Sequence, residues 1–295
     1  MRTVTSLSRK LLYALLALLL IGGMFILALP TIMHKAGMHP EYQGPVFKLP
    51  GKRALIITTS HGVLAAPGKT EGPATGVAAS ELVHPYYIFS DGGMQVDVAS
   101  INGGSIPIAP DSLGRMTATP ETNRFLEDPI FKAKVKNSIP IGKIDFTQYD
   151  IVFLAGGWGA AYDLGYSPVL AKKISEAYYG KRQAMIGGVC HGVLGLINAR
   201  DRDGNLLIAG RRMTGVSDKQ IRELGIEITP QHPETELRKA GAVYESQTAF
   251  RDLFATHVVT DDEKRFVTGQ NQNSSSETAH VMMGAIAKRE GNIGK

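Results

Sequence analysis

The hydrophobic pattern divides the chain into an apolar N-terminal segment and a longer part with regularly spaced short apolar runs. Residues 11–29 contain no charged side chain, and residues 30–50 carry several prolines with little periodicity. From residue 51 onward, apolar runs alternate with amphipathic stretches until about residue 290. The pattern predicts an apolar helix over 11–29, a linker or tether over 30–50 and one α/β domain over 51–290.

Short runs rich in β-branched and apolar residues predict buried strands over residues 54–59, 95–100, 150–155 and 183–189. Amphipathic stretches predict helices over 76–92, 169–179, 190–197 and 276–288. Weaker strand candidates lie at 206–208, 212–215, 257–260 and 266–268. Regular alternation of strand and helix predicts a flavodoxin-like sandwich with a mostly parallel central sheet and helices on both faces.

The apolar segment has the length of a membrane-crossing helix, because nineteen helical residues span about 28 Å. Arg2, Arg9 and Lys10 precede it, and residues 1–30 contain no acidic residue. The positive-inside rule then places residues 1–10 in the cytoplasm and the domain outside it. A cleaved signal peptide is the main alternative and a buried helix a weaker one. The apolar run is long for a signal peptide, however, and no clear cleavage site follows it.

Charge and cysteine content exclude several classes of function. The net charge of +5 comes from 32 basic and 27 acidic residues, and three of the basic residues precede the apolar segment. The remaining balance of +2 is too small and too dispersed to indicate a nucleic-acid partner. Cys190 is the single cysteine, so an intrachain disulfide and a cysteine-built metal site are both excluded.

Candidate chemistry collects where the predicted strands end. His61 follows the first strand, a glycine-rich segment at 156–159 follows the third, and Cys190 follows the fourth. In parallel sheets, functional groups gather at the carboxyl ends of the strands. The pattern therefore predicts that these three places meet in one site.

The residues around Cys190 are typical of a nucleophile elbow, in which a strand turns abruptly into a helix. Gly187, Gly188 and Gly192 leave the necessary room. A helix N-terminus favours the thiolate, and the N–H of His191, with that of Gly156 or Gly157, would form an oxyanion hole. The alternative is an inert core cysteine, since free cysteines are usually buried.

Two motifs give the chain a family resemblance. The segment G-x-C-H-G around Cys190 resembles the ThiJ/PfpI superfamily, which has the class I glutamine-amidotransferase-like fold. The pattern T-G-x-x-x-x-E-x-x-H-P-Y from Thr75 to Tyr86 resembles its heat-shock branch, which includes the glutathione-independent glyoxalase III enzymes. The resemblance extends over residues 52–288, and the apolar segment lies outside it.

The resemblance implies catalytic roles for Cys190 as nucleophile, Glu81 as general acid and base, and His191 as base. It places Asp218 where an acidic residue orients the histidine, although an aspartate that caps a helix is equally ordinary. Trp158, beside Gly156 and Gly157, replaces the histidine that the family often has in its glycine-rich loop. His61 is a candidate to compensate for that loss, or an ordinary loop residue. No metal or organic cofactor is implied.

The implied activity is conversion of a small reactive 2-oxoaldehyde, such as methylglyoxal, to a hydroxy acid through a Cys190 hemithioacetal. A stress-linked holdase chaperone, a cysteine hydrolase or amidase, and a non-catalytic member are the alternatives. His232 and Glu234 imitate the H-x-E dyad of glutamine amidotransferases, but they resemble instead a helix of this branch that begins at Pro230. Relatives in this branch suggest a homodimer, and residues 11–29 suggest a membrane contact.

Overall fold

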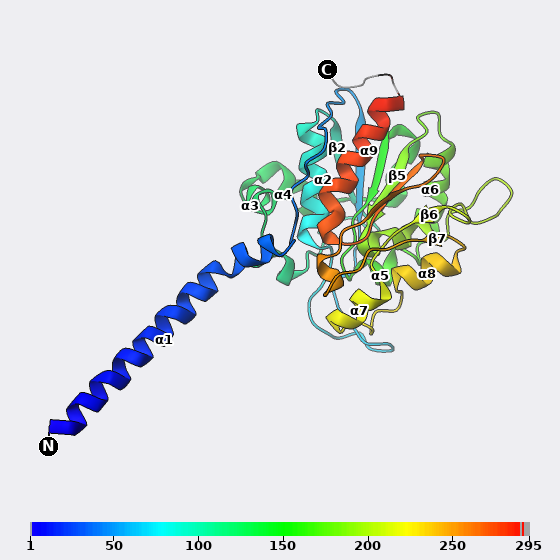
Figure 1. Cartoon of the computed structure of the whole chain (residues 1–295). Helices are drawn as coiled ribbons and strands as arrows, with labels where there is room; N and C mark the ends of the chain where they lie inside the picture. The colour runs from blue at the N-terminus through cyan, green and yellow to red at the C-terminus, as the bar shows by residue number, and fades with distance from the viewer. Residues whose placement is uncertain (1, 290, 292–295) are drawn as a thin grey trace.

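The computed structural model describes residues 2–289 and 291, which form an α/β domain with one long helix projecting from it (Figure 1). The strands are β1 (Arg53–Thr58), β2 (Gln95–Ser100), β3 (Ile139–Pro140), β4 (Ile151–Leu154), β5 (Met185–Val189), β6 (Arg212–Met213), β7 (Val243–Tyr244), β8 (Val258–Thr260) and β9 (Phe266–Gly269). The α-helices are α1 (Arg2–Lys35), α2 (Ala79–Asp91), α3 (Pro120–Glu127), α4 (Pro129–Lys136), α5 (Ala160–Asp163), α6 (Pro168–Tyr179), α7 (Asp218–Leu224), α8 (Pro233–Lys239) and α9 (Ser275–Arg289).

The central sheet has seven strands in the order β3-β2-β1-β4-β5-β9-β8. Every neighbouring pair is parallel except β8 with β9. A small separate sheet pairs β6 with β7. The mostly parallel sheet predicted from the sequence is confirmed. The carboxyl ends of β1, β4, β5 and β9 lie along one edge, which is where ligand sites form in such sheets.

Helices cover both faces of the sheet because successive side chains of a strand point to opposite sides. In β1, Ala54 and Ile56 enter one buried apolar cluster, while Leu55 and Ile57 enter the other. The first cluster includes side chains of α2, α4 and α9, and the second includes those of α6. This double burial explains why the strands read as continuous apolar runs rather than as alternating ones.

The N-terminal helix α1 extends away from the domain (Figure 1). Its stretch from residue 9 to 35 is long and apolar enough to cross a membrane, and none of it is buried in the domain. These properties fit a membrane anchor and a signal sequence equally. The helix continues to Lys35, past the start of the predicted linker. The rest of that linker is not a free tether, because Met38 and Leu49 are buried against the domain.

Several predicted boundaries and elements were wrong. Helix α2 begins at Ala79 rather than Gly76, since Val77 forms a β-bridge with Ile108. Residues 206–208 form no strand and contribute one isolated bridge followed by a turn. The segment after Cys190 is a 3₁₀ helix, η4 (Cys190–Leu196), because two glycines in seven residues disfavour an α-helix. Helix α8 begins at Pro233 rather than Pro230.

Candidate active site

Cys190 lies at the sharp turn between β5 and η4, as the elbow pattern predicts. Its backbone φ is 55°, in the left-handed region that non-glycine residues rarely adopt. The flanking glycines are sterically required, because a Cβ at Gly188 or at Gly192 would lie 2.2 Å from the carbonyl oxygen of Leu154. The turn therefore presents the thiol at the carboxyl end of β5 in a strained conformation typical of a nucleophile.

Glu81, in the first turn of α2, is fully buried beside this thiol. Its Oε2 accepts a hydrogen bond of 2.8 Å from the Gly156 N–H, and its Oε1 has no hydrogen-bond partner among the described residues. Burial raises the pKa of the Glu81 carboxyl to about 8, although the Gly156 N–H and Cys190 oppose that shift. Glu81 is therefore mostly protonated at neutral pH, and in that form it does not repel a neighbouring thiolate.

Two backbone N–H groups, from His191 and Gly157, stabilise negative charge on the Cys190 sulfur. Burial and the charge of an ionised Glu81 raise the pKa of the Cys190 thiol well above its ordinary value, and these two N–H groups oppose that rise only in part. The Gly156 N–H is already bonded to Glu81. Of the two glycines considered for an oxyanion hole, the geometry thus leaves Gly157 as the donor that faces the reacting sulfur.

His191 contacts the nucleophile through Nδ1, which lies 3.4 Å from Cys190 Sγ. Burial, together with a smaller effect of the nearby His232, lowers the pKa of His191 to about 3, so the ring is neutral. Its Nε2 is buried without a hydrogen-bond partner among the described residues. The ring therefore has one nitrogen at the thiol and the other unpaired.

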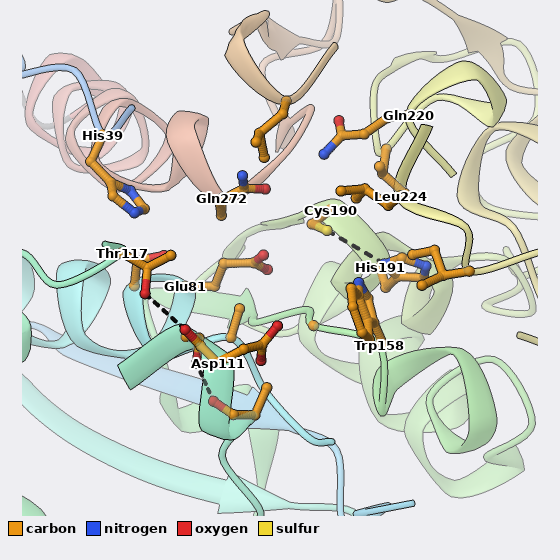
Figure 2. A pocket seen from close by; sticks show the side chains of 18 of the residues that line it. His39, Glu81, Asp111, Thr117, Trp158, Cys190, His191, Gln220, Leu224 and Gln272 are labelled. Atoms are coloured by element: carbon orange, nitrogen blue, oxygen red, sulfur yellow. Dashed lines mark hydrogen bonds between the residues drawn. The ribbon is translucent and has the colours of Figure 1, made fainter. Parts of the chain in front are cut away.

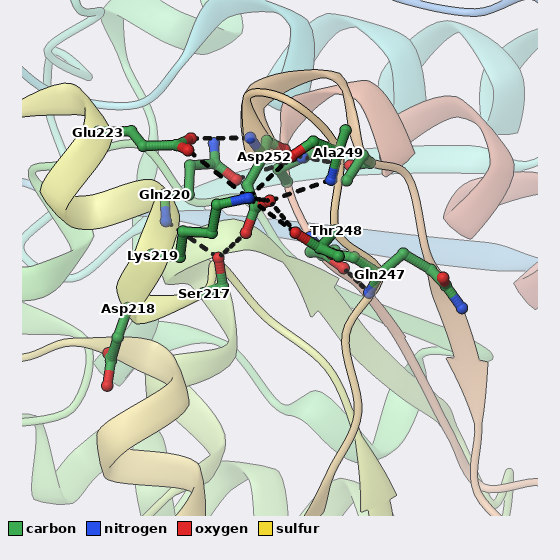
Figure 3. A network of polar contacts seen from close by, with 12 residues as sticks. Ser217, Asp218, Lys219, Gln220, Glu223, Gln247, Thr248, Ala249 and Asp252 are labelled. Carbon is green, nitrogen blue, oxygen red and sulfur yellow. Dashed lines mark hydrogen bonds and ion pairs between the residues drawn. The ribbon is translucent and has the colours of Figure 1, made fainter.

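Asp218 does not hydrogen-bond to His191 in this structure. Its Oδ2 accepts from Thr235 Oγ1 at 2.8 Å, and its N–H donates to Glu234 at 2.9 Å. Figure 3 shows its side chain turned away from the polar network that its neighbours form. Asp218 thus links the start of α7 to α8. Glu234, the acidic residue of the H-x-E segment, also pairs with Arg238.

Cys190, Glu81 and His191 open into a cavity of about 230 Å³ (Figure 2). Trp158 and Gly157 line it, whereas Gly156 is not among the lining residues that the structure describes. His61 is not among the lining residues that the structure describes. Instead its Nε2 contacts the Val63 carbonyl oxygen at 2.6 Å, and its ring stacks on Tyr162. It therefore does not replace the histidine missing from the glycine-rich loop.

The cavity also contains side chains that the sequence reasoning missed. Gln272 follows β9, and Gln220 lies on α7. The first was predictable, because residues 270–272 come directly after a strand at the same edge of the sheet as Cys190. Met38 and His39 of the former linker also line the cavity, and their short segment carries no signal for such a contact.

A buried cysteine on an elbow, a protonatable carboxyl beside it and two inward-pointing N–H groups define an α/β protein equipped for cysteine-dependent chemistry on a small molecule. The profile of the DJ-1/PfpI family matches residues 73–283. This chain therefore belongs to the DJ-1/PfpI family, in agreement with the resemblance seen in its sequence.

Relatives with solved structures and curated names extend this assignment. The Rapid Encystment Protein 24 kDa of Francisella tularensis superposes with a TM-score of 0.72 at 31% identity, covering 80% of this chain and 99% of its own. Glyoxalase III of Candida albicans superposes with a TM-score of 0.70 at 26% identity, covering 79% and 97%. The glutathione-independent glyoxalase hsp3101 of Schizosaccharomyces pombe is 26% identical over 244 residues, which are 78% of this chain and 94% of that protein.

Proposed function

We propose that this chain is a glyoxalase III-like enzyme that converts 2-oxoaldehydes to 2-hydroxy acids without glutathione. The observation that carries the proposal is the pairing of Cys190 with a fully buried Glu81, whose pKa of about 8 lets it hold and release a proton near neutrality. Relatives named glyoxalases, at 26–28% identity over most of the chain, support it.

The geometry suggests a reaction in which Glu81 donates and removes the protons that the substrate gains and loses. The Cys190 thiolate adds to the aldehyde carbon while protonated Glu81 donates to the forming alkoxide, which gives a hemithioacetal. The Glu81 carboxylate then removes the proton from that carbon to give an enediolate. It returns this proton to the adjacent carbon while the hydroxyl proton moves from the first oxygen to the second. The product is a 2-hydroxy thioester. Water hydrolyses this thioester, releases the 2-hydroxy acid and regenerates Cys190.

The N–H groups of Gly157 and His191 would stabilise the oxygen that becomes negative in the addition and in the hydrolysis. Neutral His191 would orient the sulfur, and the Glu81 carboxylate would accept the proton of the attacking water, which restores the proton that Glu81 donated in the first step. A cysteine hydrolase would need these same groups but not Glu81, whose burial would then have no chemical use. The carboxyl beside the thiol therefore favours the isomerase-type reaction.

The test is turnover of methylglyoxal by the full-length chain in detergent, without glutathione, followed as lactate. We expect Cys190→Ala to abolish turnover, and Glu81→Gln to lower kcat by about 10²–10⁴-fold, the range for loss of a general acid–base group. Alkylation of the single cysteine, measured by intact mass, verifies that Glu81→Gln keeps the thiol accessible. Turnover that survives Cys190→Ala would refute the proposed mechanism.

We also propose that α1 anchors the domain to a membrane, with residues 1–10 in the cytoplasm and the domain on the other side. The length of the apolar stretch and the basic residues before it support this topology. Protease treatment of intact spheroplasts and of lysed spheroplasts tests it. A domain that stays protected in intact spheroplasts would contradict the topology, and a mature chain beginning after residue 30 would contradict the anchor.

A further inference from the structure

The reaction cavity has two chemically different parts. Cys190, Glu81 and His191 form its reactive end. The remaining wall is largely apolar and is assembled from elements far apart in the sequence: Met38, Trp158, Leu224, Ile226 and Leu253. Figure 2 shows Trp158 and Leu224 turned toward the same space as Cys190. A substrate held at the thiol would therefore extend its other end along an apolar surface.

The charges of the lining residues restrict that other end further. Among the lining residues that the structure describes, none is lysine or arginine, and the carboxyl groups are those of Glu81 and Asp111. A phosphate, a carboxylate or a glutathione adduct would find no cation there, and Asp111 would repel it. The cavity of about 230 Å³ also exceeds what methylglyoxal needs, because that molecule adds a single methyl group to its two carbonyls.

Met38 is held in the wall by specific contacts. Its carbonyl oxygen lies 2.9 Å from His34 Nδ1, and the next residue, His39, donates its N–H to Asn273 Oδ1 at 2.9 Å. Asn273 in turn donates to the carbonyl oxygen of Gly37 at 3.3 Å. The segment that follows α1 is thus fixed against the 3₁₀ turn at Gln272–Ser274, just before α9. Met38, which lines the cavity, lies three residues beyond the end of α1 at Lys35.

We propose that this site prefers 2-oxoaldehydes whose neutral apolar substituent is larger than methyl and lies against Met38, Trp158 and Leu224. This inference rests on the proposed function and specifies its substrate class. If α1 spans a membrane, the cavity opens close to the bilayer, where such apolar oxoaldehydes concentrate. Each methylene buried in the cavity should raise kcat/KM about fourfold, the factor that corresponds to about 0.8 kcal/mol.

The experiment compares methylglyoxal with butylglyoxal, using the full-length chain in detergent. We expect kcat/KM to be about sixty-fold higher for butylglyoxal, because three methylenes are added. Leu224→Ala should lower this ratio several-fold. Leu224 is 38% exposed, so its truncation carries little risk to folding. Leu126→Ala, on the exposed surface of α3 and outside the cavity, is the matched control and should leave the ratio unchanged.

Butylglyoxal partitions into detergent micelles to the same extent with every variant. This partition therefore cancels when the kcat/KM ratio of Leu224→Ala is compared with that of Leu126→Ala. A wild-type ratio near one, or a ratio unaffected by Leu224→Ala, overturns the inference while methylglyoxal turnover leaves the proposed function intact. If neither aldehyde is turned over, the proposed function fails. The inference, which names the substrates of that function, then falls with it.

Discussion

Two buried polar regions lie close together in this molecule, and they differ in how completely their atoms are paired. In the network around Asp252, Oδ1 accepts from Lys219, Thr248 and the Ala249 N–H, and Oδ2 accepts from Ser217 at 2.7 Å (Figure 3). In the reaction cavity, by contrast, Glu81 Oε1 has no hydrogen-bond partner among the described residues. One carboxyl is surrounded by donors, and the other is nearly deprived of them.

This difference moves the two pKa values in opposite directions. Burial alone would raise the pKa of both carboxyls. At Asp252 the ion pair with Lys219 and the hydrogen bonds outweigh burial and lower the pKa. At Glu81 burial prevails and the pKa rises to about 8. The comparison teaches that a buried carboxylate with many donors stabilises the fold, whereas one with few donors holds a proton for chemistry at a cost in stability.

The largest effect expected from this contrast is on stability at Glu81. Between its ordinary pKa of 4.5 and the folded value of about 8, the folded chain holds a proton that the unfolded chain has lost. The contribution of Glu81 to the free energy of unfolding is therefore most favourable below pH 4.5, and it decreases as the pH rises toward 8. Relative to Glu81→Gln, which cannot ionise, the wild type should lose about 4 kcal/mol of unfolding free energy from pH 5 to pH 8.

The measurement is denaturant unfolding of both proteins in detergent, followed by the fluorescence of Trp158, the single tryptophan. The difference between the two stability curves is the quantity of interest, because other titrating groups are common to both. Curves that stay parallel over this pH range would show that Glu81 ionises normally and is not the proton store inferred for the reaction.

Asp252 should have a smaller effect on the free energy of unfolding, and its dependence on pH should be opposite to that of Glu81. Asp252→Ala leaves the buried Ser217 hydroxyl and the Thr248 hydroxyl without their acceptor, which should cost about 2 kcal/mol of unfolding free energy at pH 7. Because the folded pKa is lowered, this contribution is present above the unfolded pKa and disappears as the pH falls through the folded value. The destabilisation should therefore shrink in acid, whereas that from Glu81 grows in base.

Asp262→Ala is the matched control, since Asp262 is 84% exposed and pairs loosely with Arg212 at 3.8 Å. Exposed pairs of this kind contribute little, so the control should leave stability unchanged. Equal effects of Asp252→Ala and Asp262→Ala in unfolding experiments would mean that the network around Asp252 does not stabilise the fold.

The sequence was most informative where local geometry alone decides the structure. Strand β2 was predicted with its observed bounds, 95–100, and the elbow at Cys190 was predicted because glycines must flank such a turn. Helices α3 and α4 were missed, although Thr119-Pro120 and Asp128-Pro129 are strong signals of helix starts. Those helices were predictable, and their signals were overlooked.

Other features depend on contacts between distant parts of the chain, and no local pattern contains them. The hydrogen bond that fixes His39 joins residues 234 positions apart. The partner of Gly156 is also distant, since its N–H donates to Glu81, 75 positions earlier. Local patterns place an N–H near a strand end, but only the packing of α2 against the sheet shows which N–H is already occupied.

The smallest predicted effect concerns Asp218, which lies next in sequence to the paired network and yet close to the reaction cavity. Because it accepts from Thr235 and makes no hydrogen bond to His191, Asp218→Asn should change kcat by less than about tenfold, well below the 10²–10⁴-fold range for loss of a general acid–base function. Thr235→Val removes the same hydrogen bond from the other side, so both variants should lose similar stability and keep the wild-type pH profile of kcat. If Asp218→Asn instead lowers kcat a hundredfold and shifts that profile while Thr235→Val does neither, then Asp218 orients His191 during turnover through a rearrangement of α7.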